Sequence, residues 1–296
     1  MFWKPLPTGQ LRTKYLREHE SEEQMNIPEL VKKEALRRGY SVRTIGTYQW
    51  CLEKFFRQYK KDPKEVKKAD IYDYLDGMIS KGKSGSTINV HHSALQFLFS
   101  EILHKRLMVN IKYSRRRKRL PEVLDKQETR RLLGAIDNKK YRLITALMYS
   151  SGLRISEVLS LKVKDLSLEN NNGWVREGKG SKDRSFIVAE NLKAELEDWI
   201  KDKSHGSYIF LSNRNRKFHP NSVRKILRKA AKRAGIQKNV YPHLLRHCFG
   251  TDVIKNGYTE AELQPLMGHK NIETTRTYVH VANAQTTRVK SPYDML

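Results

Sequence analysis

Apolar residues recur at helical spacing through the first hundred residues, so this part of the chain is predicted to be helical. Residues 27–38 are amphipathic and end at Gly39, and Ser41 stands where the N-cap of a second helix belongs. A third helix is predicted over residues 69–79, and a fourth opens at Ser86. The apolar positions of the second and fourth helices are Ile45, Tyr48, Cys51, Leu52 and Phe55, and Ile88, Val90, Leu95, Phe97, Leu98 and Ile102.

The pattern changes in the second half, where helical segments flank a β-hairpin. Helical spacing over residues 125–136 and 141–150 precedes the strands WVRE and RSFIVA, which enclose the turn GKGSKD. The segment YIFLS at 208–212 is a candidate for a further strand. Four more helices are predicted, over residues 221–234, 242–255, 259–267 and 271–281. The third of them starts with the capping box TEAE and ends at Gly268.

These patterns predict a mainly α protein with a small β-sheet, built from an N-terminal helical domain and a second, α+β domain. The expected organisation is an N-terminal arm, a helical domain, a linker, the α+β domain and a C-terminal tail, at residues 1–24, 25–113, 114–121, 122–281 and 282–296. No internal repeat is visible in the sequence.

Membrane and secretory signals are absent from the sequence. It has no run of about 18 apolar residues, and its opening residues are mixed and polar, so we expect neither a membrane span nor a signal peptide. Cys51 and Cys248 are too few for a disulfide framework and lack metal-ligand spacing. We therefore expect a cytoplasmic protein with two buried free thiols and no metal site.

The chain is strongly basic, and the excess is spread over both halves. It holds 58 Lys and Arg residues against 32 Asp and Glu, a formal net charge of +26. Of these, 26 basic and 13 acidic residues lie at or before Pro121, so each side of this proline carries +13. Two basic halves indicate that both contact the same polyanion. An RNA-packaging protein or a lysine-rich, heat-adapted surface would show a similar charge.

A run of positive charge separates the two domains. It precedes Pro121 and consists of Arg115, Arg116, Arg117, Lys118 and Arg119. Five adjacent cations repel one another and cannot pack in a core. We interpret the run as an extended linker that follows DNA phosphates. A solvated loop or a localisation signal is the alternative.

An arginine within an apolar stretch marks the first candidate site. In SSGLRISEVLSL, Gly152 breaks the preceding helix and Arg154 follows at the turn. An arginine among apolar residues needs an anionic partner, because an unpaired buried charge is costly, and Glu157 lies within the next turn. An ordinary Arg–Glu ion pair without further function is the alternative.

The hairpin turn GKGSKD is the second candidate site. It carries Lys179 and Lys182, and its glycines, Gly178 and Gly180, allow unusual backbone angles. Such a turn can hold a flexible lysine over a phosphate group. A solvated turn is the alternative.

A helix start rich in histidine and arginine forms the third candidate site. In YPHLLRHCFGT, Pro242 suits the first helical position, and His243 and Arg246 share a face near the N-terminus. Backbone N–H groups at a helix start favour an anion, so this arrangement indicates a phosphate site. His247 is expected on a different face, in a structural role.

The fourth candidate site is LMGHKNIETTRTYVH. Gly268 ends one helix, His269 follows, Asn271 can cap the next helix, and Tyr278 lies on that helix. Taken alone, such a tyrosine would be interpreted as half-buried packing. Its position after the other three motifs favours a chemical role.

The order of these motifs carries the functional interpretation. GLRxSE, a GKG hairpin, HxLRH, GH and a tyrosine nine positions later follow one another over about 125 residues, after a helical domain and a basic linker. In this respect residues 25–296 resemble the tyrosine recombinases of the phage integrase family, most closely the Xer-like members. The family's SAM-like core-binding domain corresponds in pattern, without a sharp motif, to the helical domain.

The resemblance implies a set of site residues. Glu157 matches an acidic position that supports the first arginine, and Lys182 competes with Lys179 for the position of the catalytic lysine. The matches to the family's active site are Arg154, Lys179, His243, Arg246, His269 and the nucleophile Tyr278.

The chemistry of a phosphodiester explains why these residue types are needed. Two guanidinium groups can hold non-bridging oxygens, and His269 would donate one more hydrogen bond. Cations near Tyr278 favour the phenolate, His243 would assist proton transfer, and a lysine would protonate the leaving 5′ oxygen. With no metal-ligand cluster in the sequence, no cofactor is expected.

The resemblance also implies partners and a cellular role. We expect a double-stranded DNA site, a homodimer on one site, a homotetramer in synapsis, and residues 282–296 docked on a neighbouring subunit. An accessory protein and association with the nucleoid are consistent with this interpretation. The short chain favours Xer-like resolution of chromosome or plasmid dimers, and a mobile-element integrase is the alternative. A type IB topoisomerase and a non-catalytic DNA-binding protein are more distant alternatives.

Overall fold

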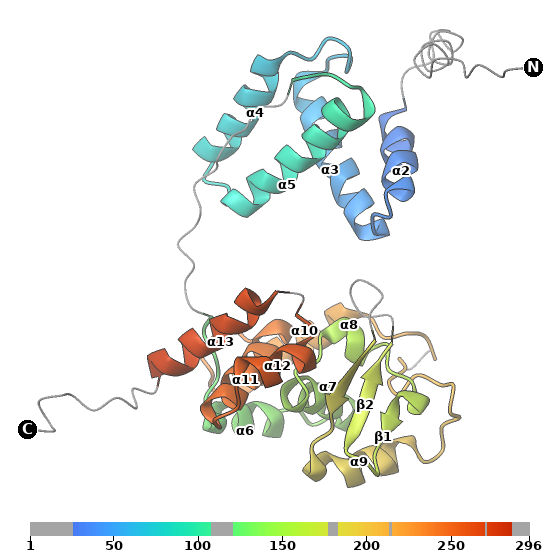
Figure 1. Ribbon diagram of the computed structural model, residues 1–296, viewed down its shortest axis with the longest axis vertical. Coiled ribbons are helices and arrows are strands. Elements are labelled where there is room, and N and C mark those ends of the chain that lie inside the picture. Colours follow the sequence, from blue (N-terminus) through green and yellow to red (C-terminus); the bar gives the residue numbers. More distant parts are fainter. Residues whose placement is uncertain (1–25, 108–120, 177–182, 213–214, 270, 286–296) are drawn as a thin grey trace, which may run out of the picture. The chain divides into compact units, whose positions relative to one another are not determined.

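The computed structural model of the chain describes residues 26–107, 121–176, 183–212, 215–269 and 271–285 (Figure 1). The chain divides into two compact units, Met1–Lys118 and Arg119–Leu296, and each is described by itself. Both are mainly helical, and the described strands form one three-stranded sheet in the second unit. The predicted fold class is confirmed. Within the described residues, no helix combines the length and apolar character needed to cross a membrane.

The first unit is a bundle of short helices that begin at side-chain caps. Its elements are α2 (Ile27–Arg37), α3 (Val42–Tyr59), α4 (Lys68–Ser80), α5 (Gly85–Gln96) and the π-helical turn η1 (Phe97–Ile102). Ser41 caps α3 as predicted, with its hydroxyl accepting from the N–H of Thr44. The prediction that Ser86 opens α5 was wrong by two residues, because Ser84 accepts from the N–H of Thr87.

Aromatic side chains fill much of the core of this bundle. Phe55 is buried and lies edge-on to Tyr74, whose hydroxyl is 3.0 Å from Nδ1 of the buried His91. Val90 was assigned to the apolar stripe, but its side chain is 39% exposed. Helical spacing explains this difference, because Ile88, His91 and Leu95 already occupy the buried face of α5.

The second unit is built around α11. Its helices are α6 (Lys126–Gly134), α7 (Lys139–Ser150), α8 (Ile155–Val158), α9 (Glu190–Ile200), α10 (Pro220–Arg233), α11 (Pro242–Lys255), α12 (Glu260–Met267) and α13 (Ile272–Gln285), with the 3₁₀ turn η2 (Val163–Asp165). Helix α11 packs against both α7 and α13. Its buried residues lie on several faces rather than in one stripe, which is typical of a central helix.

The sequence predicted most of these helices but missed α8 and α9. Helix α8 has only four residues, too few for a periodic pattern. Helix α9 buries only Leu196 completely among its described residues, so its apolar signal is weak. The caps of α12 were predicted correctly: Thr259 and Glu262 form the capping box, and Gly268 ends the helix at φ +58°.

The antiparallel sheet has the strand order β1 (Leu166–Ser167), β2 (Asn172–Val175) and β3 (Arg184–Ile187). Val175 pairs with Arg184, which confirms the predicted hairpin. The prediction of a strand at 208–212 was wrong, since this segment makes only isolated bridges at Tyr208 and Leu211. Its apolar residues Ile209 and Phe210 are buried in the core, so the apolar run reports burial rather than a strand.

Candidate active site

Arg154 and Glu157 form the ion pair that the sequence predicted. Gly152, with φ +61°, follows the end of α7, and Arg154 stands at the N-cap of α8. Nη1 of Arg154 donates to Oε1 of Glu157 at 2.7 Å, and the Arg154 backbone N–H donates to Oε2 at 2.7 Å. This double contact fixes the Arg154 side chain beside the turn at residue 152.

Arg246 is fully buried on α11, where an unpaired cation would be costly. Nη1 donates to the carbonyl of Gly152, and Nη2 donates to the carbonyl of Met267 and lies 3.2 Å from Nε2 of His269. Burial, and then the charge of Arg154, lower the pKa of Arg246 to about 10. The guanidinium therefore remains charged at neutral pH and joins the two turns that hold Arg154 and His269.

His269 is neutral, and its hydrogen bonds assign the tautomer. A guanidinium only donates, so Nε2 accepts from Arg246, and the proton on Nδ1 is donated to Oγ1 of Thr275 at 2.9 Å. Burial, and then the charge of Arg246, lower the pKa of His269 to about 4. Nε2 of His269 is thus an acceptor towards Arg246, and the predicted hydrogen bond from His269 to a phosphate stays a prediction.

Tyr278 lies within this cluster, with its side chain 2% exposed. Its ring is stacked on His269 with the centroids 6.1 Å apart and the planes 9° apart. It also lies against α11 at Gly250, where an added Cβ would come within 2.9 Å of the ring. Burial raises the pKa of Tyr278 to about 12, although Arg246 and Arg154 act in the opposite direction. The cations expected to favour the phenolate are present, but burial outweighs them in the free chain.

His243 and His247 lie together on α11, with ring centroids 4.5 Å apart. The prediction that His247 occupies a different face was wrong, because residues four apart are neighbours on a helix. The His247 ring is also 5.6 Å from that of Tyr278. Burial, and then Arg246 and Arg154, lower the pKa of His243, so its imidazole is neutral and can accept a proton at pH 7.

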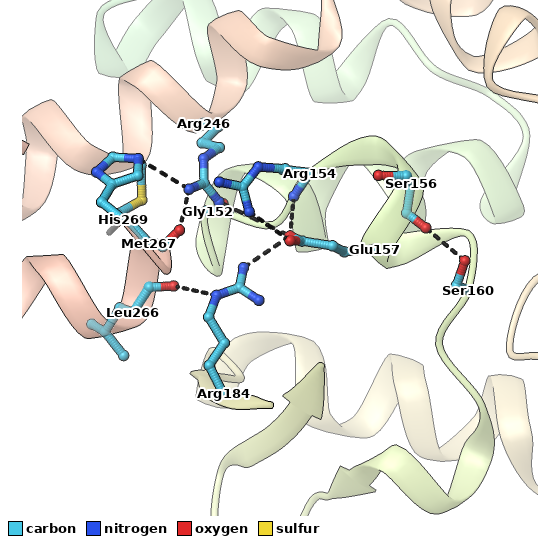
Figure 2. A network of polar contacts seen from close by, with 10 residues as sticks. All are labelled: Gly152, Arg154, Ser156, Glu157, Ser160, Arg184, Arg246, Leu266, Met267 and His269. Carbon is cyan, nitrogen blue, oxygen red and sulfur yellow. Dashed lines mark hydrogen bonds and ion pairs between the residues drawn. The ribbon is translucent and has the colours of Figure 1, made fainter. Parts of the chain in front are cut away.

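Arg184 is a member of the cluster that the sequence argument missed. From the start of β3, its Nη2 donates to Oε2 of Glu157 at 2.8 Å, and its Nε donates to the carbonyl of Leu266 at 3.2 Å (Figure 2). Strand alternation could have identified it, because residues two apart point to one side and Phe186 is buried.

Several predicted residues lie outside the described part of the chain. These are Lys179 and Lys182 of the hairpin turn, Arg115, Arg116, Arg117, Lys118 and Arg119 of the linker, and residues 286–296 of the tail. Their predicted roles stay predictions.

The described residues gather more positive than negative charge at this site. The guanidinium groups of Arg154, Arg184 and Arg246 surround the carboxylate of Glu157, with Arg246 Nη1 4.0 Å from Oε2 (Figure 2). One carboxylate neutralises only one of three cations, so the cluster can hold an anion such as a phosphate. Tyr278 places a hydroxyl-bearing ring in the same cluster.

Comparison with known proteins assigns the chain to a family. Residues 122–285 match the family described as "Phage integrase family", and residues 29–108 match the domain described as "Phage integrase, N-terminal SAM-like domain". The chain therefore belongs to the phage integrase family, as the motifs predicted.

Named relatives extend over most of the chain. It is 33% identical over 248 residues to "Tyrosine recombinase XerA" of Pyrococcus horikoshii, covering 82% of this chain and 85% of the relative. It is 30% identical over 303 residues to an "Integrase/recombinase" of Escherichia coli, covering 87% of this chain and 90% of the relative. A crystal structure of the XerH site-specific recombinase bound to a palindromic difH substrate shares the fold, with a TM-score of 0.71 and 22% identity. The match covers 94% of this chain and 87% of that chain.

Proposed function

We propose that this chain is a site-specific tyrosine recombinase that cleaves and rejoins DNA through a 3′-phosphotyrosyl intermediate. The observation that carries the proposal is the position of the Tyr278 ring, which lies in one cluster with Arg154, Arg246 and His269. These residues come from four separate segments, and only the fold brings them together. Membership in the phage integrase family supports the same activity.

The cluster suggests a role for each cation. Arg154 and Arg246 would hold the non-bridging oxygens of the scissile phosphate, since a guanidinium presents a fixed fork of donors. A phosphate oxygen would compete with Nε2 of His269 for Arg246, and a protonated His269 could then donate to the phosphate. Losing one such preorganised donor typically costs roughly 3–4 kcal/mol of transition-state stabilisation.

The proposed steps balance without an external energy source. The hydroxyl oxygen of Tyr278 attacks phosphorus, its proton passes to His243, and the bond from phosphorus to the 5′ oxygen breaks. Lys179, or Lys182, protonates that oxygen. Because the phosphotyrosyl bond conserves the energy of the phosphodiester, a second 5′ hydroxyl can reverse the steps and reseal the strand without ATP. No step requires a metal ion.

A Xer-like role, the resolution of chromosome or plasmid dimers, is the preferred biological function. The similarity to a relative named XerA supports it, whereas the relative named integrase/recombinase favours the alternative, a mobile-element integrase with the same chemistry. We further propose that a homodimer occupies one double-stranded DNA site and that two such dimers form a homotetramer in synapsis.

A nicked suicide substrate tests the chemistry. Footprinting of the purified protein on DNA flanking its gene would define a site, and a nicked duplex of that sequence would trap the covalent intermediate. We expect a protein–DNA band that Tyr278→Phe abolishes, because the ring keeps its packing but loses the nucleophile. The band should persist in EDTA.

Tyr258→Phe is the matched control, since Tyr258 belongs to the same unit and its side chain is exposed. This variant should react like the wild type. A wild-type protein that protects the site but never forms a covalent band would instead be a non-catalytic DNA-binding protein. A band that EDTA removes would contradict metal independence.

A further inference from the structure

The side chain of Arg184 touches two segments that hold the proposed phosphate-binding residues. Nη2 donates to Glu157, the partner of Arg154, and Nε donates to the carbonyl of Leu266 in the last turn of α12. That turn leads directly into Gly268 and His269. The Arg184 side chain is 11% exposed, and both of the groups to which it donates belong to the protein itself (Figure 2).

The turn at Gly268 is shaped to receive this side chain. Gly268 has φ +58°, and an added Cβ would lie 2.7 Å from Cδ and 2.8 Å from Nε of Arg184. The glycine therefore meets two requirements at once, because it permits the left-handed backbone and leaves room for the arginine. Strand β3 and the end of α12 are held together at this point.

Arg184 also determines how the Glu157 carboxylate is shared. Oε2 accepts from the Arg154 backbone N–H and from Arg184, while Nη1 of Arg246 stands 4.0 Å away. Burial disfavours the Glu157 anion, yet its pKa is lowered, with the charge of Arg184 as the largest single cause of the lowering and the contacts of Arg154 after it. Without Arg184, Oε2 of Glu157 could accept a hydrogen bond from the guanidinium of Arg246 or Arg154 instead. That guanidinium would then bind the carboxylate rather than a DNA phosphate.

We propose that Arg184 is a positioning residue for DNA cleavage, which holds Glu157 and the Leu266–Gly268 turn so that Arg154, Arg246 and His269 are preorganised for the phosphate. This inference rests on the proposed function. The role belongs to the arginine fork specifically, because a lysine could not span Glu157 and Leu266 in the same geometry.

The test measures the single-turnover rate of covalent-complex formation on the suicide substrate at saturating DNA. Arg184→Gln should lower this rate by about 10- to 100-fold, the usual cost of slightly misplaced catalytic groups, with little change in DNA affinity. Arg184→Lys, which keeps the charge and so protects folding, should recover only part of the rate. Arg176→Gln is the control on the same hairpin: Arg176 is 56% exposed and pairs with Asp183, and its loss should leave the rate unchanged.

A double variant separates positioning from a general structural role. Because Arg184 acts in part through Glu157 and in part through the Leu266 carbonyl, adding Arg184→Gln to Glu157→Gln should slow the reaction by clearly less than the product of the two single losses. Rate losses that multiply would overturn the inference, as would a full wild-type rate in Arg184→Gln or a loss confined to DNA affinity. A wild-type protein that forms no covalent complex would refute the proposed function itself, whereas a reactive wild type with an equally reactive Arg184→Gln refutes only this inference.

Discussion

Single residues at the site owe their properties to burial as much as to charge. Burial raises the pKa of Tyr278 to about 12 and lowers the pKa of Arg246 to about 10, and in each case it favours the neutral form. The free chain therefore holds a neutral phenol next to a charged guanidinium. In the proposed mechanism the phenol proton is therefore transferred during the attack, with the assistance of His243, rather than lost beforehand to form a phenolate.

The buried histidines should make the fold sensitive to mild acid. Burial first, and then neighbouring charges, lower the pKa values of His247 and His269 to about 4, whereas an unfolded histidine titrates near about 6.5. Below about pH 6.5 the unfolded chain binds more protons, so stability falls as the pH decreases toward 4 and is fully present above that window. Thermal melts between pH 7 and 5 should show a falling midpoint.

The variant His247→Asn tests whether the buried histidines cause this pH dependence of stability. It removes one of the two histidines whose pKa is lowered to about 4, so the midpoint should depend less steeply on pH between 7 and 5, while His269, His243 and His91 keep their contribution. Carboxylates contribute mainly below about pH 5, because unfolded Asp and Glu titrate near 4. An unchanged slope in the variant would show that His247 does not titrate differently in the folded and unfolded states.

At the scale of elements, α11 presents backbone without a side chain to the ring of Tyr278, the proposed nucleophile. Gly250 has no side chain, and the ring of Tyr278 occupies the space that a Cβ would need. Gly250→Ala should displace the ring and slow covalent-complex formation by about 100-fold, while DNA affinity is retained. Single-turnover kinetics and a gel-shift titration would measure both quantities.

Gly134→Ala is the matched control for this helix substitution. Gly134 ends α6 in the same unit, and a Cβ there would meet no atom within 4 Å. The control should react at the wild-type rate and gain up to about 1 kcal/mol of stability from helix propensity. Equal rates for Gly250→Ala and wild type would mean that the packing seen in the free chain is irrelevant to catalysis.

At the scale of the whole molecule, the net charge of +26 predicts the salt dependence of DNA binding. Each neutralised phosphate releases a counterion, so a protein with 6–10 such contacts loses about 10³- to 10⁵-fold in affinity between about 50 and 200 mM salt. Fluorescence anisotropy on a random duplex should give a steep negative slope of log affinity against log salt. A flat dependence, or equal affinity for structured RNA, would contradict duplex DNA as the partner.

The sequence alone determined most elements and the family. Periodic apolar residues, Ser41, the Thr259–Glu262 box and Gly268 defined helices and their ends, because capping and burial depend on residues three or four positions apart. The ordered motifs around Arg154, His243, Arg246, His269 and Tyr278 indicated the phage integrase family, and the comparisons agree.

Only the tertiary structure decided how the charges are shared. That Arg184 shares Glu157 with Arg154, that His269 accepts from Arg246, and that the phenol of Tyr278 is neutral against Gly250 all depend on contacts between segments far apart in the chain. Such contacts set burial and the direction of each hydrogen bond, and these decide protonation states. Local sequence patterns report the spacing of residues along one element, so they cannot supply this information.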